Sequence, residues 1–317
     1  MAVKILNQAN GNNWVYYHAD CIEAVKGLPD DKIHYSIFSP PFSSLYTYSN
    51  SERDMGNTKD DEQFMEHFEY LVQDLIRVTM AGRLCSFHCM NLPQSKQNHG
   101  EIGIRDFRGE LIRMFIKHGW IFHSEVVIWK DPVTAMQRTK ALGLLHKQIE
   151  KDSCMSRQGI PDYLITMRKP GNNPERVGGP FKKYVGDEVA MNKRSEILNP
   201  SEAESARGFS IDVWQRYASP VWMDINPSNT LQRQSARDER DERHICPLQL
   251  QVIERAIQLW SNPNDTILSP FGGIASEGYQ AIKMGRRFIG VELKKTYWEQ
   301  GVNNLKAAEM EQSTLLT

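Results

Sequence analysis

Two stretches of the chain place polar groups where a predicted strand ends. The first is "SPPF", which begins at Ser39 and follows "KIHYSIF", whose apolar pattern predicts a strand over 32–38. Pro40 and Pro41 end that strand, because proline has no amide hydrogen for a sheet ladder and its φ is locked. The Ser39 hydroxyl and the Phe42 ring therefore flank a stiff backbone. Taken alone, this stretch is more typical of a turn than of a site.

The second stretch, residues 265–292, has the order strand, glycine turn, helix, strand and acid. "DTILSPFGG" predicts a strand that runs into a tight turn at Gly272 and Gly273, and the next helix has Ser276 as its predicted N-cap. Glu292 stands at the carboxyl end of the following strand. Glycines let a ligand approach the backbone, and a carboxylate there can hold both ribose hydroxyls. We interpret the pattern as a nucleoside site, with a merely tight βα turn as the alternative.

Strands and helices alternate along most of the chain. Strands are predicted at 13–20, 32–38, 81–89, 122–129, 163–167, 265–273 up to the glycine turn, and 286–293. Helices are predicted at 21–29, 64–76, 111–120, 247–260, 276–285, with Gly285 as its stop, and 297–310. This alternation predicts an α/β fold with a doubly wound, mostly parallel sheet covered on both faces.

The composition is that of an ordinary soluble protein. Charged residues make up 24% of the 317 residues and the formal net charge is −1, so any footprint for nucleic acid must be local. No segment resembles a signal peptide or a membrane span, and the five scattered cysteines suit reduced thiols in a cytoplasmic protein. "CSFHC" at 85–89 lacks zinc-ribbon spacing, so we interpret its cysteines as structural and expect no metal.

The regular pattern breaks after Trp129. Residues 133–194 contain twelve Lys or Arg and six Asp or Glu, a local positive excess on a chain of net charge −1. A surface that meets polyanionic phosphate explains this excess, and a solvated loop is the alternative. Residues 195–243 are polar and irregular and end in "RDERDER", which is typical of a solvated helix face or a linker.

Together, the motifs resemble those of the amino-group DNA methyltransferases that use S-adenosylmethionine. "SPPF" is similar to the catalytic motif [D/N/S]-P-P-[Y/F/W] of that family, and "NDTILSPFGGIA", "GVEL" and "HICPLQ" are similar to its cofactor motifs. "YYHADCIEAVKGLPDDKIHYSIFSPPF" also matches the family pattern. The catalytic motif precedes the cofactor motif, as in the circularly permuted beta class. The resemblance covers about 1–130, 160–170 and 244–310.

The resemblance implies a Rossmann-like methyltransferase fold and a role for individual residues. Residues 1–130, with the strand near 163–169, would form the catalytic half of the core, 131–243 an inserted target-recognition region and 244–317 the cofactor half. The catalytic pocket would consist of Ser39, Pro40, Pro41 and Phe42. The cofactor would be held by Asp20 at its adenine end, His244, Pro247, Ser269, Pro270, Phe271, Gly272, Gly273, Ser276, and Glu292 at the ribose.

Three residues depart from the family pattern. Ser269 stands where an acid is usual, Ala275 replaces the second motif glycine, and Cys246 replaces a lysine. The missing carboxylate removes one acceptor for the ammonium of the cofactor, which water or another acid could replace.

The implied reaction moves a methyl group to an exocyclic amine of a flipped base, without a metal or a covalent nucleophile. The Ser39 hydroxyl and the Pro40 carbonyl would accept the amine hydrogens while Phe42 stacks on the base. Serine at the first motif position favours cytosine N4, with adenine N6 as the alternative. The candidates for DNA contact are Tyr46, Tyr48, Arg138, Lys140, Lys147, Arg157, Lys182 and Lys183, although ordinary packing of the two tyrosines is about as good an explanation.

The expected partner is double-stranded DNA, in a prokaryotic or phage-encoded cytoplasmic protein that is a monomer or a homodimer. A separate restriction nuclease is compatible with this interpretation. Two other functions compete with it. Methyltransferases of protein glutamine use a similar pocket but carry Asn first and the reverse motif order. A DNA-binding protein that kept the fold and lost catalysis would explain Ser269 and Ala275.

Overall fold

A computed structural model describes residues 5–42, 61–94, 100–139, 144–178, 213–231 and 247–315. Its strands are β1 (Ile5–Asn10), β2 (Trp14–Ala19), β3 (Ile33–Phe38), β4 (Thr79–Met90), β5 (Leu92–Gln94), β6 (Gly103–Arg105), β7 (Ile121–Ile128), β8 (Asp162–Arg168), β9 (Val221–Trp222), β10 (Thr266–Ser269) and β11 (Arg287–Glu292). Its helices are α1 (Cys21–Lys26), α2 (Asp61–Val78), α4 (Phe107–Lys117), α5 (Pro132–Thr139), α6 (His146–Lys151), α9 (Leu250–Trp260), α10 (Ser276–Lys283) and α11 (Lys295–Leu315).

Within these described segments the strands form one nine-stranded sheet, in the order β1-β2-β11-β10-β3-β4-β8-β7-β9, and a small β5-β6 hairpin. The centre of the sheet, from β2 to β4, is parallel, and β8 runs antiparallel between β4 and β7. This confirms the predicted doubly wound, mostly parallel sheet. The strands β10 and β11, from the end of the chain, lie between β2 and β3, from its beginning.

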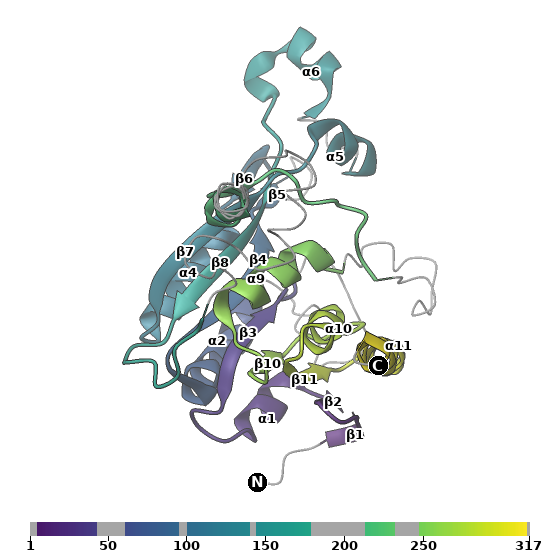
Figure 1. Cartoon of the computed structure of the whole chain (residues 1–317). Coiled ribbons are helices and arrows are strands. Elements are labelled where there is room, and N and C mark those ends of the chain that lie inside the picture. The colour runs from purple at the N-terminus through teal and green to yellow at the C-terminus, as the bar shows by residue number, and fades with distance from the viewer. Residues whose placement is uncertain are drawn as a thin grey trace, which may run out of the picture.

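Helices cover both faces of the sheet (Figure 1). The helices α9, α10 and α11 pack on one face around a core that includes Tyr16, Ile253 and Phe288. On the other face α1, α2 and α4 enclose a second core, rich in phenylalanine, that includes Phe68 and Phe115. The short helices α5 and α6 project beyond the end of β7 (Figure 1). No helix in the described part of the chain is long and apolar enough to cross a membrane.

One predicted helix cap is wrong. Ala275, not Ser276, is the N-cap of α10, and no side chain caps that helix end. Ala275 has φ 62°, a left-handed conformation that turns the chain sharply out of the glycine turn. The predicted stop at Gly285 is confirmed, because this residue has φ 74° directly after the helix C-cap.

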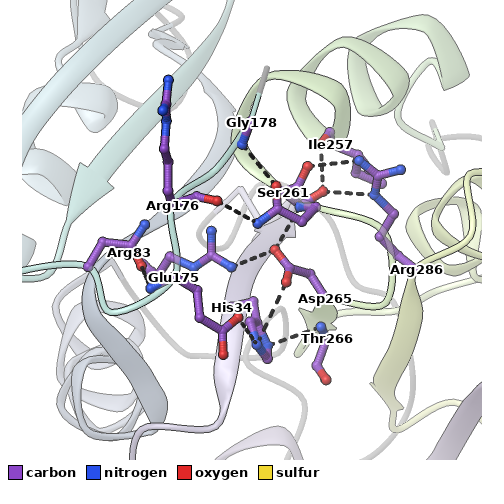
Figure 2. Close-up of polar contacts among 12 residues, drawn as sticks. His34, Arg83, Glu175, Arg176, Gly178, Ile257, Ser261, Asp265, Thr266 and Arg286 are labelled. Atoms are coloured by element: carbon purple, nitrogen blue, oxygen red, sulfur yellow. Dashed lines mark hydrogen bonds and ion pairs between the residues drawn. The ribbon is translucent and has the colours of Figure 1, made fainter. Parts of the chain in front are cut away.

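A polar network joins the amino-terminal ends of the parallel strands (Figure 2). The two motifs follow the other ends of β3 and β10. The Arg83 guanidinium, on β4, lies 2.5 Å from the Asp265 carboxylate before β10, and both side chains are almost fully buried. The His34 ring, on β3, accepts a hydrogen bond from the Thr266 amide and faces Asp265 and Glu175 at 3.7 and 3.6 Å. Because Arg83 already neutralises Asp265, we interpret this cluster as a structural ion pair.

Candidate active site

The two motifs meet at the carboxyl edge of the sheet. Ser39 follows β3, Ser269 ends β10 and Glu292 ends β11, and these three strands are parallel neighbours. Asp20 follows β2, the next strand along, and caps α1 by accepting from the amides of Ile22 and Glu23. In open α/β sheets, ligands bind at this edge. The sheet thus brings together motifs that lie at opposite ends of the sequence.

The glycine loop after β10 has a tightly constrained backbone. The Gly272 amide donates to Val291 O at 2.7 Å, and a Cβ on Gly272 would come within 2.6 Å of the Tyr16 ring. The Tyr16 hydroxyl donates to Gly273 O at 2.7 Å. Burial, together with Glu292 and Glu277, raises the pKa of Tyr16 well above its ordinary value, so this donor stays protonated. Tyr16 of β2 therefore holds the backbone of the loop in place. The sequence pattern did not predict this role.

Glu292 is held by backbone amides on both of its carboxylate oxygens. Gly273 N donates to Oε2 at 2.8 Å and Lys294 N donates to Oε1 at 2.7 Å. The geometry fixes the plane of the carboxylate beside the glycine loop, as a ribose-binding acid requires.

The residues around the glycine loop fit the expected cofactor. Apart from Gly273 itself and its two chain neighbours, no heavy atom of the described residues lies within 4 Å of the position that a Cβ on Gly273 would take, so one side of the loop is open. Ser269 Oγ and Ser276 Oγ are buried and have no hydrogen-bond partner among the described residues. Burial raises the pKa of Glu277, on the first turn of α10, to about 8. Open space and buried polar groups without partners are what a polar ligand with an ammonium and hydroxyls would satisfy.

The SPPF motif turns away from the end of β3. Pro40 is buried, while Ser39, Pro41 and Phe42 are half-buried. Ser39 Oγ lies 3.0 Å from His88 Nδ1, and the Phe42 ring lies 6.0 Å from the His88 ring at a tilt of 52°. The hydroxyl and the aromatic ring are therefore on the same side of the site as one histidine of β4.

Two further side chains lie behind that histidine. His88 Nε2 faces Asp162 Oδ2 at 3.2 Å, and Asp162 Oδ1 accepts from Lys130 Nζ at 2.5 Å. Burial alone would raise the pKa of Asp162, but His88 and Lys130 outweigh it, and the pKa lies below its ordinary value. Asp162 is therefore an ionised carboxylate inside the protein.

The sequence contained a signal for this histidine that we assigned otherwise. His88 belongs to "CSFHC", whose cysteines, Cys85 and Cys89, are buried in the core as predicted for structural thiols. Burial raises the pKa of both thiols. Side chains alternate along a strand, so His88 points to the face opposite to these cysteines. The β3–β4 register, which pairs Phe38 with Phe87, sets Ser39 beside His88.

The remaining predicted residues are less informative. Phe271 packs on the rings of Phe38 and Phe68 and so anchors the loop from the core side. Pro247 and Pro270 lie within the described chain, before α9 and after β10, and Arg138 lies on α5. Lys147 is exposed on α6, and half-buried Arg157 donates to Gln158 O. Outside the described residues lie Tyr46, Tyr48, Lys140, Lys182, Lys183 and His244.

Comparison with known proteins gives a consistent picture. The family described as DNA methylase matches residues 33–303. The chain is 22% identical over 285 residues to the orphan methyltransferase M.BamHII of Bacillus amyloliquefaciens, covering 89% of this chain and 91% of that protein. It is 36% identical over 212 residues to the DNA adenine methyltransferase YhdJ of Escherichia coli (strain K12), covering 59% and 72%.

Solved structures share the fold. TTHA0409 from Thermus thermophilus, complexed with S-adenosyl-L-methionine, superposes with a TM-score of 0.63 at 16% identity, covering 94% of each chain. The PvuII DNA methyltransferase, described as cytosine-N4-specific, gives a TM-score of 0.58 at 13% identity, covering 98% of this chain and 97% of that one. At these identities the solved structures support the fold alone. They do not indicate the target base, which has to be inferred from the residues of the site.

Proposed function

The chain belongs to the DNA methylase family, as an S-adenosylmethionine-dependent DNA amino-methyltransferase, and we propose that its target is the N4 amine of cytosine. The observation that carries this proposal is the position of Ser39 at the end of β3. The neighbouring strand, β10, ends in Ser269 and the glycine loop that fits the cofactor. The acceptor for the amine and the methyl donor would therefore occupy adjacent strand ends.

The residues of the chain have to make a poor nucleophile reactive. The lone pair of an exocyclic amine is delocalised into the ring, and two acceptors that draw its hydrogens out of plane restore it to nitrogen. Ser39 Oγ and the Pro40 carbonyl are suited to this, because the two prolines fix the direction of the carbonyl. When bound, S-adenosylmethionine supplies an electrophilic methyl group whose bonding pair returns to sulfur. Positioning then contributes much of the rate.

The choice of cytosine rests on the strength of the acceptor. A serine hydroxyl is neutral and accepts more weakly than the carboxylate of an Asp in the same position. We expect the N6 amine of adenine, as the more electron-poor of the two, to need the stronger acceptor. A hydroxyl should be sufficient for the N4 amine of cytosine. The base would leave the duplex to reach this pocket, because its amine is paired inside DNA. Phe42, half-buried beside His88, provides an aromatic surface for it.

Adenine N6 is the second candidate. One observation favours it: the relative with 36% identity, YhdJ, is named a DNA adenine methyltransferase. A base-specific product assay decides between the two, because both reactions would use the same acceptors and the same methyl donor.

The deciding experiment identifies the methylated nucleoside. The protein is incubated with labelled S-adenosylmethionine and unmethylated genomic DNA, which offers many sequence contexts, and the DNA is digested to nucleosides for chromatography and mass spectrometry. We expect N4-methylcytosine. N6-methyladenine would overturn the assignment of the base. DNA binding without any transfer of label would instead support a protein that kept the fold and lost catalysis.

Substitution of the pocket residues tests its composition. We expect Ser39→Ala and Phe42→Ala to lower methyl transfer by about 10²-fold or more, because each removes a contact to the reacting base. Calorimetric affinity for S-adenosylmethionine should stay within about twofold of wild type, because neither residue belongs to the glycine loop. Phe122→Ala, at an exposed position of β7, is the matched control and should retain full activity. Full activity of either pocket variant would refute the proposed pocket.

A further inference from the structure

A line of four side chains begins at the serine of the SPPF motif. Ser39 Oγ lies 3.0 Å from His88 Nδ1, His88 Nε2 lies 3.2 Å from Asp162 Oδ2, and Lys130 Nζ lies 2.5 Å from Asp162 Oδ1. The side chains of His88 and Asp162 are only 9% and 5% exposed, so solvent cannot substitute for these partners. The chain of contacts links β3, β4, β8 and the residues after β7.

The contacts determine where the histidine carries its proton. Asp162 is an ionised carboxylate and can only accept hydrogen bonds. At this ion-pair distance we infer that Nε2 carries a hydrogen, because an unprotonated Nε2 would set its lone pair against a carboxylate oxygen. In a neutral imidazole the other nitrogen, Nδ1, then has a lone pair. Nδ1 is the atom that faces Ser39.

We propose that His88, oriented by Asp162 and Lys130, is a positioning residue that fixes the Ser39 hydroxyl as an acceptor for the target amine. Ser39 donates its single hydrogen to Nδ1, so its lone pairs are left for the amine N–H. This inference rests on the proposed function, since it assigns a partner to the serine of that pocket. It explains how the Ser39 hydroxyl, which can donate or accept, acts only as an acceptor toward the target amine.

Lys130 has a separate part in this arrangement. A lone carboxylate beside His88 would favour the doubly protonated imidazolium, whose Nδ1–H would donate to Ser39 and leave the serine hydrogen free to turn toward the base. The Lys130 ammonium pairs with Asp162 and so offsets part of the negative charge that the carboxylate presents to His88. Among the described residues, Asp162 on β8, with Lys130 bound to it, is the charged group that faces His88.

Asp162→Asn tests the proposal by exchanging the donor and the acceptor at the contacts that His88 makes with residue 162 and with Ser39. Lys130 Nζ needs an acceptor, so the amide oxygen of the new side chain should face it and the amide NH₂ should face His88 Nε2. Nε2 then accepts, Nδ1 carries the hydrogen, and Ser39 receives a donor. We expect kcat to fall on the order of 10²-fold, as in other Ser–His–Asp arrangements where Asn imposes the wrong tautomer. The KM for S-adenosylmethionine should change by less than about threefold.

Two measurements separate this role from a merely structural one. In a double-mutant cycle, Asp162→Asn should add almost nothing to Ser39→Ala, because Asp162 acts through that serine. In ¹⁵N NMR of the histidine rings, without cofactor or DNA, His88 should be protonated at Nε2 in the wild type and at Nδ1 in the variant. His88→Asn identifies the signal by its absence.

The proposal is overturned by a folded Asp162→Asn variant with wild-type kcat, by effects that multiply in the Ser39→Ala background, or by an Nδ1–H tautomer in the wild type. If Asp162→Asn does not fold, Lys130→Met takes its place, because the lysine side chain is 36% exposed. That variant should lower kcat while Ser39 is present and have little further effect in the Ser39→Ala background, and a wild-type kcat in the variant would also refute the proposal. Failure of the proposed function itself would show separately, as a wild type that yields N6-methyladenine or transfers no methyl group to DNA.

Discussion

At the scale of single residues, the glycine loop depends on a backbone conformation that is unfavourable for residues with a side chain. Gly273 has φ 54°, its amide donates to Glu292 and its carbonyl accepts from Tyr16. An alanine there would cost ~1–2 kcal/mol in the left-handed region and would place a methyl group in the open space beside the loop. We expect Gly273→Ala to weaken binding of S-adenosylmethionine at least tenfold, as measured by calorimetry.

Gly285→Ala is the matched control for that prediction. Gly285 has φ 74° after α10, so the backbone strain is similar, and the nearest atom to a new Cβ would be Gln312 Nε2 at 3.8 Å. This variant should lose thermal stability by a similar amount and keep its cofactor affinity. Wild-type cofactor affinity in Gly273→Ala would show that the open space is not the binding site.

The end of β3 at the SPPF motif and the turn of the glycine loop could be predicted because both follow local backbone rules. Two prolines end a strand, and two glycines make a tight turn, whatever surrounds them. The partners of Ser39 could not be predicted in this way. His88 reaches Ser39 through the β3–β4 register, and Asp162 reaches His88 through the antiparallel pairing of β4 with β8. Register depends on packing along the whole strand, which a short motif does not encode.

At the scale of elements, the network at the amino ends of the strands gives stability that depends on pH. Burial, the largest effect, lowers the pKa of His34, and Arg83 acts in the same direction against Asp265 and Glu175. The unfolded chain, with a histidine pKa of about 6.5, therefore binds more protons than the folded one below that pH. The free energy of unfolding should fall as the pH drops below about 6.5.

His34→Asn isolates this contribution, because the Asn oxygen can still accept from the Thr266 amide. We expect the difference in the free energy of unfolding between wild type and variant, measured in urea, to become smaller from pH 7.5 to pH 5.5. A constant difference for His34→Asn would mean that the pKa of His34 does not change on unfolding.

Elements with a strong apolar period were predicted, and those without one were missed. The strand β1 has the sequence "ILNQAN" and is mostly exposed, so no alternation of apolar and polar residues marks it. The strand β9 has two residues, and its pairing with β7 depends on the position of residues far along the chain. Both are edge strands, where tertiary contacts rather than sequence pattern decide the structure.

At the scale of the whole molecule, the order of the motifs along the chain explains the sheet. The pair β10–β11 inserts between β2 and β3, so the two halves of the core fold into one sheet although a long segment separates them. Residues 131–243, apart from the strand near 163–169 that we assigned to the catalytic half, remain our proposed target-recognition region, and its strand β9 belongs to the sheet. The oligomeric state and a companion nuclease remain predictions from the sequence.

The placement of α5 and α6 leads to a prediction about DNA binding. Both helices follow β7, which is parallel to β9 and ends at the same edge of the sheet as β3 and β4 (Figure 1). They therefore project from the edge that carries Ser39, and Lys147 is exposed on α6. A lysine that neutralises one phosphate releases about one counterion. Its loss therefore makes the negative slope of log K against log salt shallower by ~0.9.

Lys147→Ala should therefore weaken binding to a labelled duplex several-fold, with a salt slope smaller by about one unit in fluorescence anisotropy titrations. Its affinity for S-adenosylmethionine should not change, because α6 lies apart from the glycine loop. Lys306→Ala removes the same charge from an exposed position on α11 and serves as the control, with the slope of the wild type. Equal slopes for the two variants would place the DNA away from α6, whereas a lower slope for Lys147→Ala alone would place the duplex backbone along the projecting helices.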